Sequence, residues 1–351
     1  MVMLGDVAQS RDNNFNLIRM IAALAVLVSH AYPITLGPGA EEPLEALTGR
    51  TLGSLAVAVF FVISGFLIAE SFARARSWQD FIVARVLRLW PALIVSLLVV
   101  AFLMGPMVTT LFPGAYFTNP AVWTFMVKNA ALATPQYSLP GVFENQPYSN
   151  VEGPIWTLFY EVVCYLGLFA AGLLGLLRRQ WAMSMLIAAF AGLWLLADIY
   201  QPALHLKIDK TLDLGLPFAV GTLMWLWKDR LPLTLWGVVG LLALTALLAT
   251  TPLYGIMLTL FLAYTTFWAA YVPDGGLRAY NRLGDYSYGV YIYAFPAQGL
   301  AVWLSGPMTP FENMVLALPL TLIPSMISWH LLEKPALALR RHPVLARSRA
   351  L

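Results

Sequence analysis

The sequence has little charge and almost no cysteine. Only 11% of its 351 residues are Asp, Glu, Lys or Arg, and 60% are hydrophobic. A soluble domain has about 25% charged residues, so this chain could not cover a water-facing surface, which excludes a soluble globular protein. The single cysteine, Cys164, lies in an apolar segment, so no disulfide can form within the chain.

Histidine and basic residues do not form the patterns that metal and nucleic-acid sites need. The four histidines have no metal-ligand spacing and no thiol partners, so we expect no metal and no permanently bound cofactor. Lys and Arg form no stripe with interleaved aromatic residues, so we expect no nucleic-acid partner. The sequence has instead long apolar runs separated by short basic clusters, which indicates a polytopic membrane protein in contact with membrane lipids.

The apolar runs predict the spans. A helix that crosses the hydrocarbon core needs about 20 mainly apolar residues. A shorter apolar segment, 122–134, contains Lys128 and fits an interfacial or re-entrant helix within a long loop, 105–153. We therefore predict an all-α protein, a single transmembrane domain over residues 1–351, with ten spans near 15–34, 53–70, 81–104, 154–177, 181–199, 211–227, 231–249, 253–271, 284–305 and 311–332.

The basic residues predict the orientation. With ten spans and a cytoplasmic N-terminus, 17 of the 21 Lys and Arg lie on the cytoplasmic side, and the other four are Arg50, Lys128, Lys207 and Lys210. The positive-inside rule favours this topology over one that inverts the later loops. We expect a multi-pass protein of the inner cell membrane, with both termini in the cytoplasm and the 105–153 loop outside it.

Ionisable residues inside the predicted spans need an explanation, because each costs roughly 2.5–3.5 kcal/mol at mid-helix. Arg19 and His30 are eleven residues apart, which is about three helical turns, so they share one face of the first span. Glu161, in the fourth span, lies near the depth estimated for His30. Two interpretations stay open. His30 marks the membrane interface and Glu161 belongs to a structural ion pair, or both residues take part in chemistry.

Other polar residues also have two interpretations. Arg85 and Arg88 are neighbours on one helix face, either as cytoplasmic anchors or as a clamp for phosphate groups. Ser64 and Gly65 form a small pair in the second span, which is typical of close helix contact. Packing explains most of the polar aromatic and hydroxyl residues, but five of them are candidates for lining an acceptor site: Trp156, Tyr160, Tyr165, Ser287 and Tyr291.

Six stretches along the chain together carry a family resemblance. They are Arg19 with His30, Phe60-Phe-Val-Ile-Ser-Gly-Phe-Leu67, Arg85-x-x-Arg88-x-x-Pro91, Trp156-Thr-Leu-Phe-Tyr-Glu161-Val-Val-Cys-Tyr165, Leu283-Gly-Asp-Tyr-Ser-Tyr288 and Ser328-Trp-His-Leu-Leu-Glu-Lys-Pro335. In this order the chain resembles the membrane-bound acyltransferase family 3, whose members typically O-acylate sugars and cell-envelope polymers. The resemblance implies a catalytic role for His30 and acyl-CoA handling by Arg19, Arg85 and Arg88.

On this basis we expect an acyl-CoA-dependent O-acyltransferase. It would move an acyl group, acetyl by resemblance, from the co-substrate acyl-CoA in the cytoplasm to a hydroxyl of a cell-envelope or exported polysaccharide or a lipid-linked glycan. His30 is the natural base, and Glu161 could orient its imidazole. The alternative is a transporter or flippase of an anionic or lipid-linked glycan, which would also use intramembrane Arg and carboxylates.

Some members of the family carry a fused extracytoplasmic SGNH hydrolase-like domain. We expect none in this chain, which ends soon after the tenth predicted span. Two routes therefore stay open: the chain completes the transfer itself, or it hands the acyl group to a separate extracytoplasmic partner.

Overall fold

The computed structural model describes residues 2–10, 12–201 and 203–339, and these are overwhelmingly helical. This confirms the all-α prediction; two two-residue strands, β1 (Val2–Met3) and β2 (Pro232–Leu233), form one antiparallel pair. The chain divides into two compact units, each assembled from segments that are distant in sequence. Five of the basic residues in the predicted cytoplasmic set lie outside the described residues: Arg11, Arg340, Arg341, Arg347 and Arg349.

Three helices run from one unit into the other. They are α2 (Phe15–Leu36), α4 (Leu52–Ala73) and α9 (Ile155–Leu173). The first unit comprises Met1–Arg19, Val57–Ala75 and Tyr160–Leu283. Its remaining elements are α1 (Leu4–Val7), α10 (Gln180–Tyr200), α11 (Leu206–Leu226), α12 (Leu235–Leu247), α13 (Tyr254–Tyr271) and 3-10 segments at Leu176–Arg178, Lys228–Arg230 and Gly275–Arg282.

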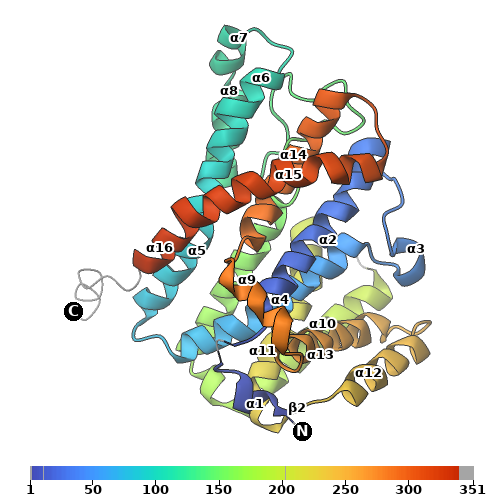
Figure 1. Ribbon diagram of the computed structural model, residues 1–351. Helices are drawn as coiled ribbons and strands as arrows, with labels where there is room; N and C mark the ends of the chain where they lie inside the picture. The colour runs from blue at the N-terminus through green and yellow to red at the C-terminus, as the bar shows by residue number, and fades with distance from the viewer. Residues whose placement is uncertain (1, 11, 202, 340–351) are drawn as a thin grey trace. The chain divides into compact units, whose positions relative to one another are not determined.

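Small residues hold the first unit together where α4 crosses α11. A Cβ added at Gly65 would overlap the Phe218 carbonyl oxygen, and one at Gly221 would overlap the Val62 carbonyl oxygen. Thr222 donates a hydrogen bond to the Gly65 carbonyl at 3.2 Å. The predicted close helix contact is confirmed at Gly65. The helices α12 and α13 complete the unit side by side (Figure 1).

The second unit comprises Met20–Ala56, Arg76–Phe159 and Gly284–Leu351. At its centre, α14 (Ser287–Ser305) is buried over nearly its whole length and packs along α15 (Pro310–Ser328). Its other elements are α3 (Glu45–Thr48), α5 (Trp78–Leu98), α6 (Gly105–Val108), α7 (Pro113–Thr118), α8 (Pro120–Ala131), α16 (Lys334–Leu339) and π-helical segments at Val99–Met104 and Trp329–Glu333.

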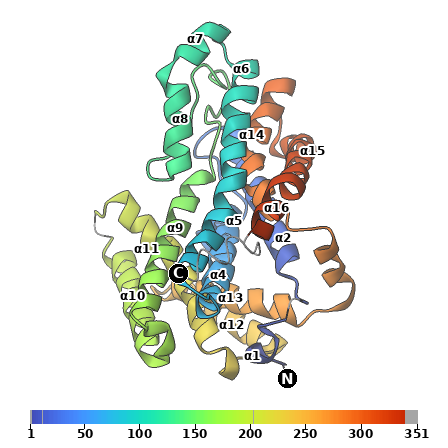
Figure 2. The ribbon, with the colours of Figure 1, turned by 90° about the vertical axis from the view of Figure 1, so that its left-hand side faces the viewer.

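The 105–153 segment is folded rather than extended. Its three short helices α6, α7 and α8 lie together, and α8 runs beside α5 (Figure 2). Tyr116 is fully buried and donates a hydrogen bond to the Ala101 carbonyl at 2.8 Å. Asn129 both donates to and accepts from the Gln136 backbone at 2.9 Å, which fixes the turn after α8. The helix α8 occupies the position of the predicted short helix.

Fewer helices than predicted have the length and composition of membrane spans. Each of the ten predicted segments coincides with a helix. Among the described residues, six helices are long and apolar enough to cross a membrane, or seven if the bent pair α13 and Gly275–Arg282 counts as one span. The helix α12 has 13 residues, about 20 Å, against a core of about 30 Å. The first turns of α11 carry Lys207, Asp209 and Lys210. The ten-span topology and its orientation stay predictions.

Candidate functional site

His30 lies in the C-terminal half of α2, within the second unit. Its ring packs edge-on against Phe295 of α14, with ring centroids 5.2 Å apart at 80°. Its Nδ1 is buried and has no hydrogen-bond partner among the residues that the structure describes. Because a buried polar atom without a partner costs stability, this nitrogen is a candidate for binding or chemistry rather than for packing.

The segment of α2 around His30 is held by buried polar contacts on both sides. Gln298 of α14 donates to the Leu27 carbonyl at 2.8 Å and to Asn313 of α15 at 3.0 Å. Ser29 accepts a hydrogen bond from the Gly53 backbone at 2.9 Å and donates to Glu42. Burial raises the pKa of the Glu42 carboxyl, and the hydrogen bond from Ser29 lowers it in part. The backbone beside His30 is therefore fixed.

Glu161 lies in the first unit, on α9, within a small polar cluster. Its carboxylate accepts hydrogen bonds from the Tyr165 hydroxyl one turn away and from Ser64 of α4 at 3.4 Å. Ser64 is also 3.4 Å from the Tyr165 hydroxyl. The cluster is Ser64, Glu161 and Tyr165, so Ser64 takes part in a polar contact as well as in helix packing.

Arg88 is engaged in an ion pair. Its guanidinium lies 2.7 Å from the Asp285 carboxylate, which precedes α14, and 5.9 Å from the centroid of the Tyr288 ring. Ser287 donates to the same carboxylate at 2.5 Å. Asp285 was not among the residues predicted for the site. Arg88 thus has a structural partner, and 23% of its side chain stays exposed for a further contact.

The other two predicted donor-binding arginines are partly buried. Arg85 lies one turn before Arg88 on α5, with its guanidinium 5.8 Å from the Phe81 ring centroid. Arg19 lies on α2 in the first unit, whereas His30 lies further along the same helix in the second. The structure therefore places Arg85 and Arg88 on one helix face, as predicted, and Arg19 and His30 on one helix.

The candidate lining residues separate between the two units. In the second unit, Tyr291 of α14 forms a 2.6 Å hydrogen bond with Thr157, one residue after the partly buried Trp156 of α9. Ser287 is buried and bound to Asp285. The buried side chains of Tyr160 and Tyr165 belong to the first unit.

Glu152 was missed by the sequence analysis. It lies in the loop just before α9, its side chain is 0% exposed, and neither carboxyl oxygen has a hydrogen-bond partner within the described residues. Burial raises the pKa of this carboxyl well above its usual range. Glu152 precedes the apolar run, so it is not among the charges inside the predicted spans. The signal available was an acidic residue directly before the Gly-Pro that opens an apolar span.

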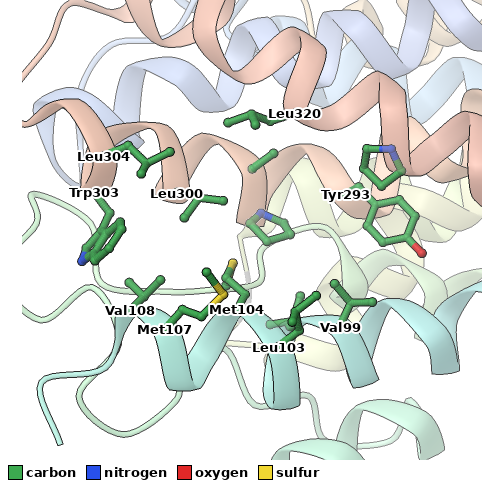
Figure 3. A pocket seen from close by; sticks show the side chains of 14 residues that line it. Val99, Leu103, Met104, Met107, Val108, Tyr293, Leu300, Trp303, Leu304 and Leu320 are labelled. Carbon is green, nitrogen blue, oxygen red and sulfur yellow. The ribbon is translucent and has the colours of Figure 1, made fainter.

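An apolar cavity of about 310 Å³ lies in the second unit, between the Val99–Val108 segment and the helices α14 and α15. Figure 3 shows Trp303 beside Val108 at one end and Tyr293 beside Val99 at the other. The lining is almost entirely hydrocarbon, so the cavity suits an apolar group rather than a charged one. Among the described residues, no cluster of His, Cys, Asp or Glu could hold a metal ion.

Taken together, the second unit offers a buried imidazole nitrogen, a buried carboxyl group and two arginines on one face of α5. An imidazole can take a proton from a hydroxyl near neutral pH, and guanidinium groups suit phosphates. Groups of these kinds can remove a proton from a hydroxyl and hold an anionic ligand.

Comparison with known proteins defines the family. Residues 12–330 match a family model described as an acyltransferase domain, and the chain belongs to this family, acyltransferase family 3. The chain is 29% identical over 338 residues to "O-acetyl transferase" of Shigella phage Sf6, covering 92% of this chain and 96% of that protein. It is also 29% identical over 371 residues to "Nodulation protein 10" of Rhizobium leguminosarum bv. viciae, covering 95% and 96%.

A third relative matches over a shorter stretch. "Acyltransferase MdmB" of Streptomyces mycarofaciens is 28% identical over 149 residues, which is 42% of this chain and 36% of that protein. No solved structure matches the chain. The chain is a multi-pass membrane protein of an acyltransferase family, which confirms the resemblance seen in the sequence.

Proposed function

We propose that this protein is an inner-membrane O-acyltransferase that moves an acetyl group from cytoplasmic acetyl-CoA to a hydroxyl of a cell-envelope or exported polysaccharide. Both termini would lie in the cytoplasm. The observation that carries the proposal is His30, a buried imidazole on a fixed helix whose Nδ1 has no partner in the described structure. The name of the phage relative, "O-acetyl transferase", supports acetyl as the group transferred.

His30 acts as the general base in this proposal. Neutral imidazole removes the proton of the acceptor hydroxyl, and the oxygen attacks the thioester carbonyl. The new C–O bond forms, the C–S bond breaks, and the CoA thiolate leaves with the proton that the imidazolium returns. The sequence predicts that Glu161 orients the imidazole, and its carboxylate accepts hydrogen bonds from Tyr165 and Ser64.

The donor is bound by arginines. Guanidinium forks of Arg85 and Arg88 on α5 would hold the phosphates of acetyl-CoA from the cytoplasmic side. A role for Arg19, near the start of α2, in handling acyl-CoA rests on the family resemblance alone. The partly exposed side chain of Arg88 is compatible with a phosphate contact beside its ion pair with Asp285. Trp156 and Tyr291 are proposed to line the path to the acceptor.

The experiment compares envelope glycans from cells that lack the protein with those from cells complemented with the wild type or His30→Gln. Mass spectrometry should find acetylated glycan only with the wild type, because loss of a general base usually costs about 10²–10⁴-fold in rate. Purified protein in lipid nanodiscs should transfer label from acetyl-CoA to glycan taken from the deletion cells. Glycan that crosses the membrane without gaining acetyl would instead indicate a transporter, and near-normal acetylation by a well-expressed His30→Gln would refute the base assignment.

A further inference from the structure

Glu152 has an arrangement that packing does not explain. Among the described residues, both oxygens are buried without a hydrogen-bond partner in one carboxyl group, that of Glu152. Its side chain is 0% exposed. Transfer of a carboxyl group out of water without a partner is unfavourable in either protonation state, and more so when the group is ionised. A carboxyl group kept in such a place lowers stability, so its retention needs a functional reason.

The position of Glu152 connects it with His30 through one aromatic ring. The next residue, Gly153, approaches Phe295 so closely that an added Cβ would overlap that ring. His30 packs edge-on against the same ring, at 5.2 Å between centroids. Both belong to the second unit. The residue that follows Glu152 and the ring of His30 therefore contact the same aromatic ring.

The two groups are complementary in hydrogen bonding. A neutral imidazole that is to accept a proton at Nε2 must carry its own proton at Nδ1, and that N–H needs an acceptor. Glu152 has carboxyl oxygens without partners that can accept this hydrogen bond. Glu161, by contrast, already accepts hydrogen bonds from Tyr165 and Ser64.

We propose that Glu152 is a positioning residue for His30, whose carboxylate accepts the Nδ1–H and balances the charge of the imidazolium during acyl transfer. This inference rests on the proposed function. The proton of the acceptor hydroxyl goes to Nε2, the acceptor oxygen bonds to the acyl carbon, and the thiolate leaves and recovers that proton. Glu152 neither gains nor loses a proton over the whole cycle, so the cycle closes on the starting state.

The surroundings of Glu152 favour its ionised form only when His30 is protonated. Burial opposes ionisation of the carboxyl and raises its pKa. Tyr293 of α14 lies within electrostatic reach of Glu152, and a phenol offers no compensating positive charge. The imidazolium formed at His30 supplies that charge. Removal of the carboxylate should therefore shift the pH dependence of turnover, which a purely structural role would not do.

The test uses the full chain in lipid nanodiscs, with labelled acetyl-CoA and envelope glycan from deletion cells. Glu152→Gln should lower kcat at least 100-fold, leave the KM for acetyl-CoA within twofold, and unfold at the same or a higher temperature than the wild type. Glu152→Asp should recover part of kcat and keep the wild-type pH profile. Glu144→Gln is the matched control, because Glu144 is exposed in the same loop and should keep kcat within twofold.

Three results would overturn the inference. They are a kcat of Glu152→Gln within twofold of the wild type, a loss of kcat that follows a lowered unfolding temperature, or an unchanged pH profile. Normal turnover in Glu152→Gln with an inactive His30→Gln would refute this inference alone and leave the proposed function intact. Normal turnover in both variants would refute the base assignment as well.

Discussion

Replacement of Arg88 by alanine would leave the Asp285 carboxylate without the guanidinium that lies 2.7 Å away. Removal of one partner from a buried ion pair costs about 3–5 kcal/mol, because the other charge stays uncompensated. The Asp285 side chain is 8% exposed and that of Arg88 is 23% exposed, and Ser287 continues to donate to the carboxylate. We therefore expect a loss near the lower end, about 3 kcal/mol.

The double variant Arg88→Ala/Asp285→Asn separates the structural role of Arg88 from donor binding. It removes both charges, and the carboxamide oxygen still accepts from Ser287, so about 2 kcal/mol of the lost stability should return. If Arg88 also contacts CoA phosphates, the double variant should regain stability but should still use acetyl-CoA poorly. Loss of a charged hydrogen bond, about 1.5–3 kcal/mol, raises KM roughly 10- to 150-fold. Arg88→Lys should recover only part, since a point charge cannot replace a bidentate fork.

The assay combines thermal unfolding of purified protein in nanodiscs with the KM for acetyl-CoA of the same samples. If Asp285→Asn fails to restore stability to Arg88→Ala, the ion pair is not what the first substitution removed. If the double variant regains both stability and a normal KM, Arg88 has only a structural role and the donor-binding assignment is wrong.

Two further predictions concern helix packing. Gly65→Ala should lower the stability by about 1–3 kcal/mol, because the added Cβ meets the backbone carbonyl of Phe218. Gly167 has open space around it, so Gly167→Ala should be neutral or stabilising by up to about 1 kcal/mol. Equal unfolding temperatures for the two would contradict the close crossing of α4 and α11. Tyr116→Phe should lower stability by about 1–3 kcal/mol, because the buried Ala101 carbonyl loses its donor; unchanged thermal unfolding of this variant would show that the hydrogen bond contributes nothing.

The positions of the helices were predictable from the sequence because apolar length is a local property. Each predicted span coincides with a helix, and the short segment at 122–134 is α8, Pro120–Ala131. Breaks within the helices were not predictable in this way. The π-helical segment Val99–Met104 extends α5 within one continuous apolar run, so no change of composition marks it.

The composition of the site was predictable in part. His30, Arg88 and Glu161 could be selected as candidates from the sequence, because an ionisable residue within an apolar run carries an insertion cost. The hydrogen-bond partners were not predictable, since they come from distant parts of the chain. Arg88 and Asp285 are 197 residues apart, and Glu161 and Ser64 are 97 apart.

Partners, rather than depth in the membrane, decide which of two carboxyl groups suits the role beside an imidazole. Glu161 and Glu152 are nine residues apart in sequence, and the rule that singles out charges within spans selects only Glu161. The structure gives Glu161 two hydrogen-bond donors and gives Glu152 none among the described residues. A carboxylate with satisfied oxygens is stabilised where it is, whereas one without partners gains most when an imidazolium forms nearby. The free-energy difference between the two protonation states of His30 is therefore more sensitive to Glu152, and for this reason a neutral substitution there should reduce turnover while stability is kept.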